Sequence, residues 1–262
     1  MIFSDVERSG QMTKDDRYLE GLIEDKIERC RSRYSPEYTT FLDAHQQSVA
    51  RKLVSRTAAG DVSFCFYGGY DDADRVIFMA LPDYITAEEA APFALIRAMC
   101  REGGRPLTHR DYLGSLTGLG IKRELTGDIL VRDDGADIIV MEEIAEFIMT
   151  NYAKAGRTAL SLARAPLSEL MIPEKKVTVV RDTLASLRLD NVVASAFGLS
   201  RTKAAEAVKR GIVFVDSIEA VKPDMQIGEG SKVVLRGSGK VYLREIGGKS
   251  RKDRIYVTFE KY

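Results

Sequence analysis

The 262-residue sequence is poor in the side chains that hold metals and form covalent cross-links. It has three cysteines, Cys30, Cys65 and Cys100, which are far apart and form no CxxC pair, and two histidines, His45 and His109. A usual zinc site needs four ligands at short spacings, and a disulfide scaffold needs more cysteines. We therefore expect no disulfide framework, no structural metal and no cofactor.

Long apolar runs are also missing. No window approaches the roughly 18 consecutive apolar residues of a membrane-spanning helix. The first ten residues, MIFSDVERSG, are polar and acidic, whereas a secretion signal has a basic stretch followed by an apolar one. With 45% hydrophobic and 30% charged residues, the composition is typical of a globular protein. We expect a soluble cytoplasmic protein with reduced cysteines.

The chain as a whole has no excess of either charge, but its parts do. The 39 Lys and Arg residues balance 39 Asp and Glu residues. Residues 181–262 hold 16 basic against 10 acidic residues, a net charge of +6, which leaves 23 against 29, a net charge of −6, for residues 1–180. This segregation favours a polyanionic partner for the C-terminal part alone.

The N-terminal part reads as helices followed by a β-hairpin. Residues 11–60 have apolar side chains at helical spacing, with Thr39 or Thr40 as the expected N-cap of a helix that Gly60 ends. Residues 61–81 read as two strands around the acidic turn GGYDDAD, which lacks the order of ligands of a calcium loop.

The middle of the chain predicts the order strand, helix, strand, strand, helix, strand. Pro92 precedes the strand FALIRAMCR, Thr108 caps a short helix, and GDILVRDD, GADIIVM and TALSLARAP are the other strands, with a helix over residues 142–152. This is the ferredoxin-like order that many RNA-binding modules share. Those three strands contain no aromatic residue, so we do not expect bases to stack on them, and a structural or docking role is favoured.

The C-terminal part predicts two short helices joined by a sharp turn. Gly198 suits the left-handed end of the first helix, and Ser200 the N-cap of the second. Arg201 and Lys203 then stand in the first turn, where the helix dipole disfavours cations unless an anion binds there. Unpaired backbone amides, Ser200 and two cations together predict a phosphate site.

The stretch RLDNVVASAFGLSR, with GIVFVD, KP and RGSGK downstream, resembles the S-four-type RNA-binding domain over residues 188–240. Asp216-Ser217 stands where many members have Asn-Gly, and Ser231 where Asp commonly follows Gly230. Residues 107–131, LTHRDYLGSLTGLGIKRELTGDILV, are similar to the central stretch of the YlmH-type bacterial proteins.

The resemblance implies an α+β protein of three parts. These are a helical region with a β-hairpin (1–88), a ferredoxin-like or RRM-like domain (89–174), and an S-four-type domain of the αL-motif class with a C-terminal extension (175–262). It also implies a non-catalytic protein that binds rRNA or tRNA at the large ribosomal subunit, in the rescue of stalled nascent chains, with no small-molecule substrate.

The candidate RNA-binding residues follow from the phosphate-site argument and from the resemblance. They are Arg188, Asp190, Ser200, Arg201, Lys203, Lys209, Arg210, Arg236 and Lys240. By resemblance Arg188, Arg201 and Lys203 contact RNA backbone, and Asp190 orients Arg188 or pairs locally. Arg236 and Lys240 could extend the surface. For Lys209, Arg210, Lys232 and the run KSRKDR, a solvated face and an RNA contact both stay open.

Two other classes of protein remain as alternatives. The first is an RNA-modifying enzyme that uses the basic domain for targeting. The sequence shows no catalytic-Asp motif of a pseudouridine synthase and no Gly-rich S-adenosylmethionine loop, and His109-Arg110-Asp111 lacks a nucleophile placed beside it. The second is a protein-binding adaptor in cell division, which would not need Arg201 and Lys203 where they stand.

Overall fold

The computed structural model describes residues 13–58, 60–101, 106–173 and 177–262. By internal contacts the chain divides into two compact units, Tyr18–Glu174 and one built chiefly of Lys175–Tyr262. The boundary that the sequence predicts near residue 175 lies outside the described residues, and the division into three domains stays a proposal. Within the described residues, no helix has the length and apolar character needed to cross a membrane.

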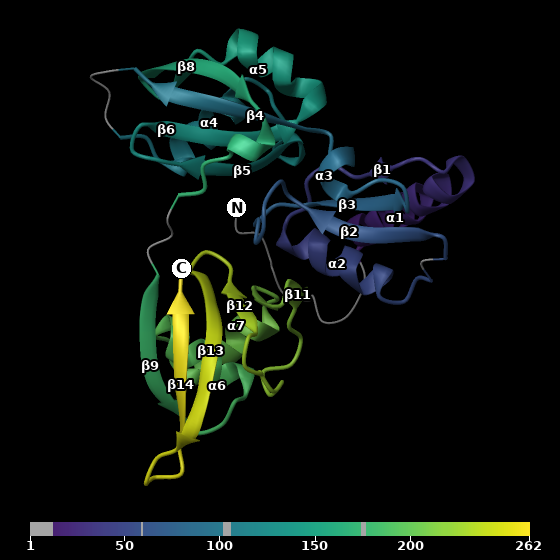
Figure 1. Cartoon of the computed structure of the whole chain (residues 1–262). Coiled ribbons are helices and arrows are strands. Elements are labelled where there is room, and N and C mark those ends of the chain that lie inside the picture. The colour runs from purple at the N-terminus through teal and green to yellow at the C-terminus, as the bar shows by residue number, and fades with distance from the viewer. Residues whose placement is uncertain (1–12, 59, 102–105, 174–176) are drawn as a thin grey trace, which may run out of the picture. The chain divides into compact units, whose positions relative to one another are not determined.

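The N-terminal region packs two helices against a small antiparallel sheet (Figure 1). Its elements are α1 (Lys14–Arg33), β1 (Glu37–Tyr38), α2 (Ala44–Val54), β2 (Val62–Tyr67) and β3 (Ile77–Pro82), and the sheet has the order β1-β3-β2. Ile23, Ile27 and Leu53 meet Phe78 in its core. The predicted hairpin of residues 61–81 is therefore confirmed.

The expected cap and end of the second helix are wrong. Asp43, and neither Thr39 nor Thr40, is the N-cap of α2, since its carboxylate accepts a hydrogen bond from the Gln46 amide, whose side chain accepts one from the Asp43 amide in return. The helix ends at Val54, well before Gly60, because the next amides, of Arg56 and Thr57, bond to the carbonyls of Leu53 and Val54 only three residues back.

The central domain has the predicted order of elements. After the short α3 (Ala87–Ala90) come β4 (Phe93–Cys100), α4 (His109–Gly118), β5 (Thr126–Val131), β6 (Gly135–Met141), α5 (Ala145–Asn151), the two-residue β7 (Lys154–Ala155) and β8 (Thr158–Ala165), with 3-10 turns at Arg123–Leu125, Glu142–Ile144 and Leu167–Glu169. The sheet order β5-β6-β4-β8 is that of a ferredoxin-like fold, so this prediction is confirmed. Thr108 caps α4 with Asp111 in a reciprocal capping box, which gives the Asp111 carboxylate a structural task.

The two central strands of the sheet, β4 and β6, are largely buried on both faces. Alternate residues of β4 and β6, among them Ile96 and Ile138, pack under α4 and α5. On the opposite face, Phe93 and Ile139 join the N-terminal sheet in a second core, where the rings of Phe41 and Phe93 stack 4.9 Å apart. The N-terminal region and the central domain therefore share one core within the first unit.

The stretch 107–131 supplies the seam of that first unit. The buried carboxylate of Asp128 accepts hydrogen bonds from the Tyr70 hydroxyl and from the amides of Asp74 and Arg75, all in the turn after β2. Gly127 lies so close to the Phe41 ring that a Cβ there would stand 2.7 Å from the ring. The predicted acidic turn thus attaches the N-terminal hairpin to the central domain through Asp128. In the part of the chain that the structure describes, no group of His, Cys, Asp or Glu side chains is placed to hold a metal.

The second unit packs two helices on one six-stranded sheet (Figure 1). Its elements are β9 (Thr178–Leu184), α6 (Leu189–Phe197), α7 (Arg201–Lys209), β10 (Val213–Val215), β11 (Ile218–Glu219), β12 (Lys232–Leu235), β13 (Gly239–Lys249) and β14 (Ile255–Lys261), with the sheet order β11-β10-β12-β13-β14-β9. The turn Asp216-Ser217 has φ values of 50° and 66°, so these residues adopt the left-handed turn that Asn-Gly favours.

Candidate nucleic-acid interface

The turn between α6 and α7 forms as the sequence predicts. Gly198 ends α6 with a φ of 67°, a left-handed conformation that glycine adopts without strain. Ser200 is the N-cap of α7, and its hydroxyl accepts a hydrogen bond from the Lys203 amide at 3.2 Å. Ala204 and Val208 are buried against α6, because small side chains let the two helices approach closely. The turn therefore has a fixed shape.

A buried carboxylate organises the amino end of this helix pair. Asp190 is 5% exposed and lies in the first turn of α6. It accepts hydrogen bonds from Nε and Nη2 of Arg188, at 3.2 and 3.1 Å, and from Nη2 of Arg201 at 3.2 Å. Burial raises the pKa of Asp190, but the bonds from Arg188 and Arg201 outweigh it and hold the pKa below its usual range. The carboxylate stays ionised and orients two arginines, one more than the sequence predicts.

Both arginines remain open to a ligand. The side chains of Arg188 and Arg201 are 37% and 60% exposed, and each guanidinium has five N–H donors, of which Asp190 engages two and one respectively. Lys203 is exposed and has no ion-pair partner among the described residues. Two pre-oriented guanidinium groups and one exposed ammonium group suit phosphate oxygens, because planar donors in fixed positions lose little entropy on binding.

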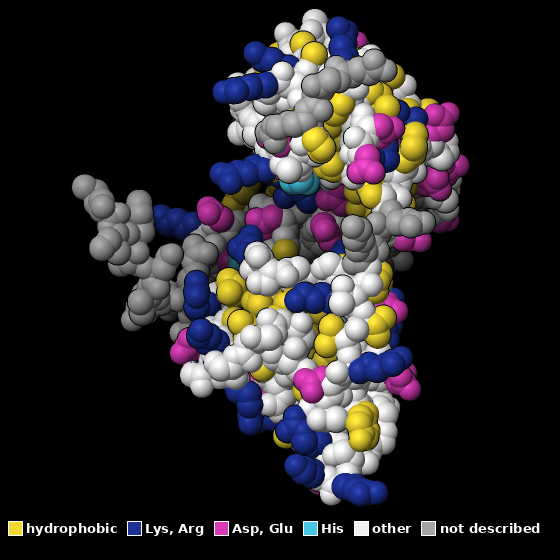
Figure 2. Space-filling model, turned by 90° about the vertical axis from the view of Figure 1, so that its left-hand side faces the viewer, with side chains coloured by type: hydrophobic (Ala, Val, Ile, Leu, Met, Phe, Trp, Pro, Cys, Tyr) yellow, Lys and Arg dark blue, Asp and Glu magenta, His cyan; other side chains and the backbone are white. Residues whose placement is uncertain are grey.

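The other candidate cations fall at the opposite end of α7 or inside the module. Lys209 and Arg210 are exposed at the carboxyl end, about 13 Å along the nine-residue helix. Arg236 lies near them, since its amide bonds to the carbonyl of Ile212, and its side chain is exposed. Lys240 is 7% exposed on β13, so its expected place on an open RNA-binding surface is wrong. Figure 2 shows Lys and Arg side chains at many points of this unit's surface, with fewer acidic ones.

The basic run KSRKDR contains one residue whose place the sequence does not reveal. It forms the loop between β13 and β14, in which Lys249 pairs with Asp253 at 2.8 Å. Arg254 reaches across to β9, where its Nε donates to Thr183 Oγ1 at 2.9 Å and its Nη2 donates to the Thr183 carbonyl. The sequence of the loop shows that it is basic. The contact between Arg254 and Thr183 becomes visible only in the fold, where β14 pairs with β9.

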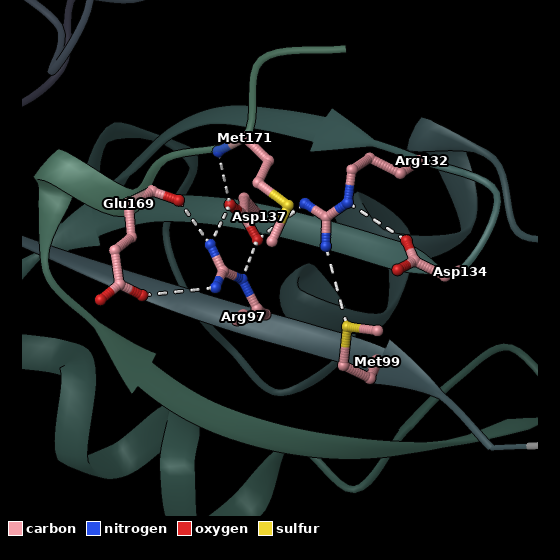
Figure 3. A network of polar contacts seen from close by, with 7 residues as sticks. All are labelled: Arg97, Met99, Arg132, Asp134, Asp137, Glu169 and Met171. Carbon is pink, nitrogen blue, oxygen red and sulfur yellow. Dashed lines mark hydrogen bonds and ion pairs between the residues drawn. The ribbon is translucent and has the colours of Figure 1, made fainter.

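RNA-recognition domains stack bases on one face of this sheet. Here polar contacts and the segment after β8 cover that face over the central strands β4 and β6. Arg97 and Asp137 lie directly opposite on β4 and β6, and their side chains form two hydrogen bonds of 2.9 and 3.0 Å (Figure 3). Arg132 pairs with the same carboxylate at 2.8 Å. The amide of Met171 donates to Asp137, and the carbonyl of Glu169 accepts from Arg97, so the segment after β8 crosses this face (Figure 3).

This network is buried as well as paired. Asp137 has no exposed surface, and the side chains of Arg97 and Arg132 are 16% and 13% exposed. Burial raises the pKa of Asp137, but the bonds from Arg97, Met171 and Arg132 overcome that effect and keep the pKa below its usual range. Together with the core around Phe93, this covers the central strands β4 and β6 on that face, and β5, β6 and β8 carry no aromatic residue for stacking.

These elements define an α+β protein in which a helical region with a hairpin and a ferredoxin-like sheet precede two helices packed on a six-stranded sheet. Comparisons with known proteins agree. Residues 104–169 match the family model described as "Putative RNA-binding domain in YlmH". The chain is 37% identical over 251 residues to the "Ribosome-associated protein quality control protein P2" of Bacillus subtilis (strain 168), a match that covers 95% of this chain and 96% of that protein.

The chain therefore belongs to the YlmH family. Among solved structures, it is similar to the "Cell division protein ylmH from Streptococcus pneumoniae", with 21% identity and a TM-score of 0.49 over 64% of this chain and all of that one. The predicted family is confirmed, and the α+β fold class is confirmed by the elements described above.

Proposed function

We propose that this protein is a non-catalytic, cytoplasmic RNA-binding factor of the ribosome that grips structured rRNA or tRNA through phosphate. The observation that carries the proposal is the pair Arg188 and Arg201, held by buried Asp190 and exposed beside the capped amino end of α7. Helix amides and cations at one point form the usual binding site for a phosphate group.

The relative's name supports the setting. The Bacillus protein is named as a ribosome-associated quality control protein, and a domain of this chain matches a model named for RNA binding. We infer that the present chain acts on the large ribosomal subunit when a nascent chain has stalled. Because the face of the central sheet is closed, we further infer that the central domain positions the C-terminal module and leaves the grip on phosphate to it.

The test is binding to purified ribosomal subunits. We expect Arg201→Ala/Lys203→Ala to lower affinity for the large subunit by about tenfold or more, since each lost phosphate contact contributes on the order of 1 kcal/mol. The control is Arg33→Ala/Lys52→Ala, which removes the same charge from exposed positions of α1 and α2.

Each outcome of this test has a meaning. Equal losses in the two double variants would show that net charge alone is responsible. Full binding by a folded Arg201→Ala/Lys203→Ala variant would refute phosphate binding at the start of α7 and favour a protein-binding adaptor. Methylation of the bound rRNA, detected by mass spectrometry only when S-adenosylmethionine is added, would instead reveal an RNA-modifying enzyme.

A further inference from the structure

An open depression lies beside the turn between α6 and α7 and has no assigned role. Its volume is about 450 Å³, and the residues that matter for its chemistry are Asp182, Ala185, Ala194, Leu199, Arg201 and Arg254. This volume is within the range of pockets that hold a small ligand. The depression belongs entirely to the second unit, and it joins the αL-motif helices to the strands that extend them.

Two arginines lie on the depression and remain accessible. Arg201 comes from the start of α7 and is oriented by Asp190. Arg254 comes from the β13–β14 loop, is exposed, and is anchored by its two hydrogen bonds to Thr183. Because both belong to one depression and both are held in place, a phosphate group can be bound between them at little entropic cost.

The depression also carries one negative charge, at the exposed residue Asp182. The carboxylate of Asp182 accepts hydrogen bonds from the Ser195 hydroxyl and the Thr183 amide. The hydrogen bond from Ser195 lowers the pKa of Asp182, and the bond from the Thr183 amide and the charge of Arg254 act in the same direction. Together they outweigh partial burial, which raises the pKa. An ionised carboxylate repels phosphate but accepts hydrogen bonds from the amino group of a base. Ala185, Ala194 and Leu199 line the same depression and give it apolar surface against which a base can pack.

We propose that this depression takes one unpaired nucleotide of the bound RNA, with its phosphate between Arg201 and Arg254 and the amino group of its base at Asp182. The proposal rests on the proposed function and adds to it a preference for RNA that has an unpaired nucleotide. A paired stem would be held through phosphate alone, whereas a stem with one unpaired cytidine would also fill the depression. Uridine, which has no amino group, would fill it less well.

The experiment measures binding of the full chain to two RNA hairpins that differ only by a single bulged cytidine. We expect the wild type to bind the bulged hairpin about tenfold more tightly. Arg254→Ala should remove this preference, and Ala185→Leu, which keeps every charge and narrows the depression, should remove it too. Arg251→Ala is the matched control, because this exposed arginine of the same loop does not line the depression and should leave the preference intact.

Base identity gives the second arm. A bulged uridine should bind more weakly than a bulged cytidine, and Asp182→Asn should reverse that order, since its amide can donate to the uracil carbonyl. Wild-type protein that binds both hairpins equally would overturn the nucleotide site and leave the phosphate grip standing. Wild-type protein that binds neither hairpin would overturn both. A preference that survives both Arg254→Ala and Ala185→Leu would place the unpaired nucleotide elsewhere and refute the proposal.

Discussion

The protein contains the same arrangement twice, with opposite consequences. In the central domain Asp137 lies between Arg97 and Arg132, and in the C-terminal module Asp190 lies between Arg188 and Arg201. Both carboxylates are buried, and arginines keep both pKa values below their usual range.

Exposure of the arginines makes the difference. The central pair is 16% and 13% exposed and is crossed by the segment that follows β8, whereas the C-terminal pair is 37% and 60% exposed. The central network is buried and ties a sheet face to the chain that covers it. The C-terminal network presents its cations to solvent. An aspartate that binds two arginines can thus close a surface or prepare one for binding, depending on what covers it.

The largest expected effect is the loss of stability in Asp137→Ala. Removing this carboxylate leaves two buried guanidinium groups without their shared partner, which costs about 3–5 kcal/mol in the free energy of unfolding. Denaturant titration measures the change. Asp134→Ala is the control, because its exposed carboxylate pairs with the same Arg132 and should cost less than about 1 kcal/mol. If the two variants lose the same free energy of unfolding, the buried network around Asp137 does not stabilise the central domain.

A smaller effect is expected on RNA binding by Arg201→Ala. The affinity should fall by about tenfold for RNAs of many sequences alike, because phosphate contacts position the ligand and carry no sequence information. The free energy of unfolding should fall by no more than about 1 kcal/mol, because Arg201 is 60% exposed and Arg188 still pairs with Asp190 after the change. Filter binding to a panel of stems checks this. A loss confined to one sequence would show that Arg201 reads a base.

Acid should weaken the folded state through the two aspartates. A carboxyl group whose pKa is lowered by folding stabilises the protein at pH values above its unfolded pKa, near 3.9, and this contribution is lost as the pH falls through the lower folded pKa. We expect Asp137→Asn to lose less stability than the wild type on acidification from pH 6 to pH 3. An unchanged pH dependence would mean that Asp137 does not contribute to acid sensitivity.

The smallest effect is on salt dependence. If about four to six cations meet phosphates, the logarithm of the affinity should fall with the logarithm of salt concentration at a slope of roughly −3 to −5. Arg201→Ala should make this slope shallower by about 1, and Asp137→Ala, where it remains folded, should leave it unchanged. An affinity independent of salt would contradict binding through phosphate.

Local sequence signals predicted the parts of this protein that depend on neighbouring residues. Gly198 and Ser200 identify the turn of the C-terminal module, and the order of strands and helices identifies the ferredoxin-like fold. The sequence does hold a signal for the cap at Asp43, because Asp caps helices at least as well as Thr and Gln46 stands three residues later, as in a capping box.

Contacts between distant segments could not be predicted in the same way. Nothing local shows that Asp137 meets Arg97 across two strands, that Arg254 reaches Thr183, or that Lys240 is buried. Alternation along β13 places a side chain on one face or the other, but the sequence does not say what covers that face. Likewise, only the fold shows that Arg188 and Arg201 both bind the carboxylate of Asp190.

The most direct test of the account is the affinity of Asp190→Ala for structured RNA, measured at one salt concentration beside the wild type. This substitution raises the positive charge of the module by one, so attraction by charge alone would tighten binding. If Asp190 orients Arg188 and Arg201 for phosphate, a folded Asp190→Ala variant binds several-fold more weakly. Equal or tighter binding by that folded variant would contradict the account.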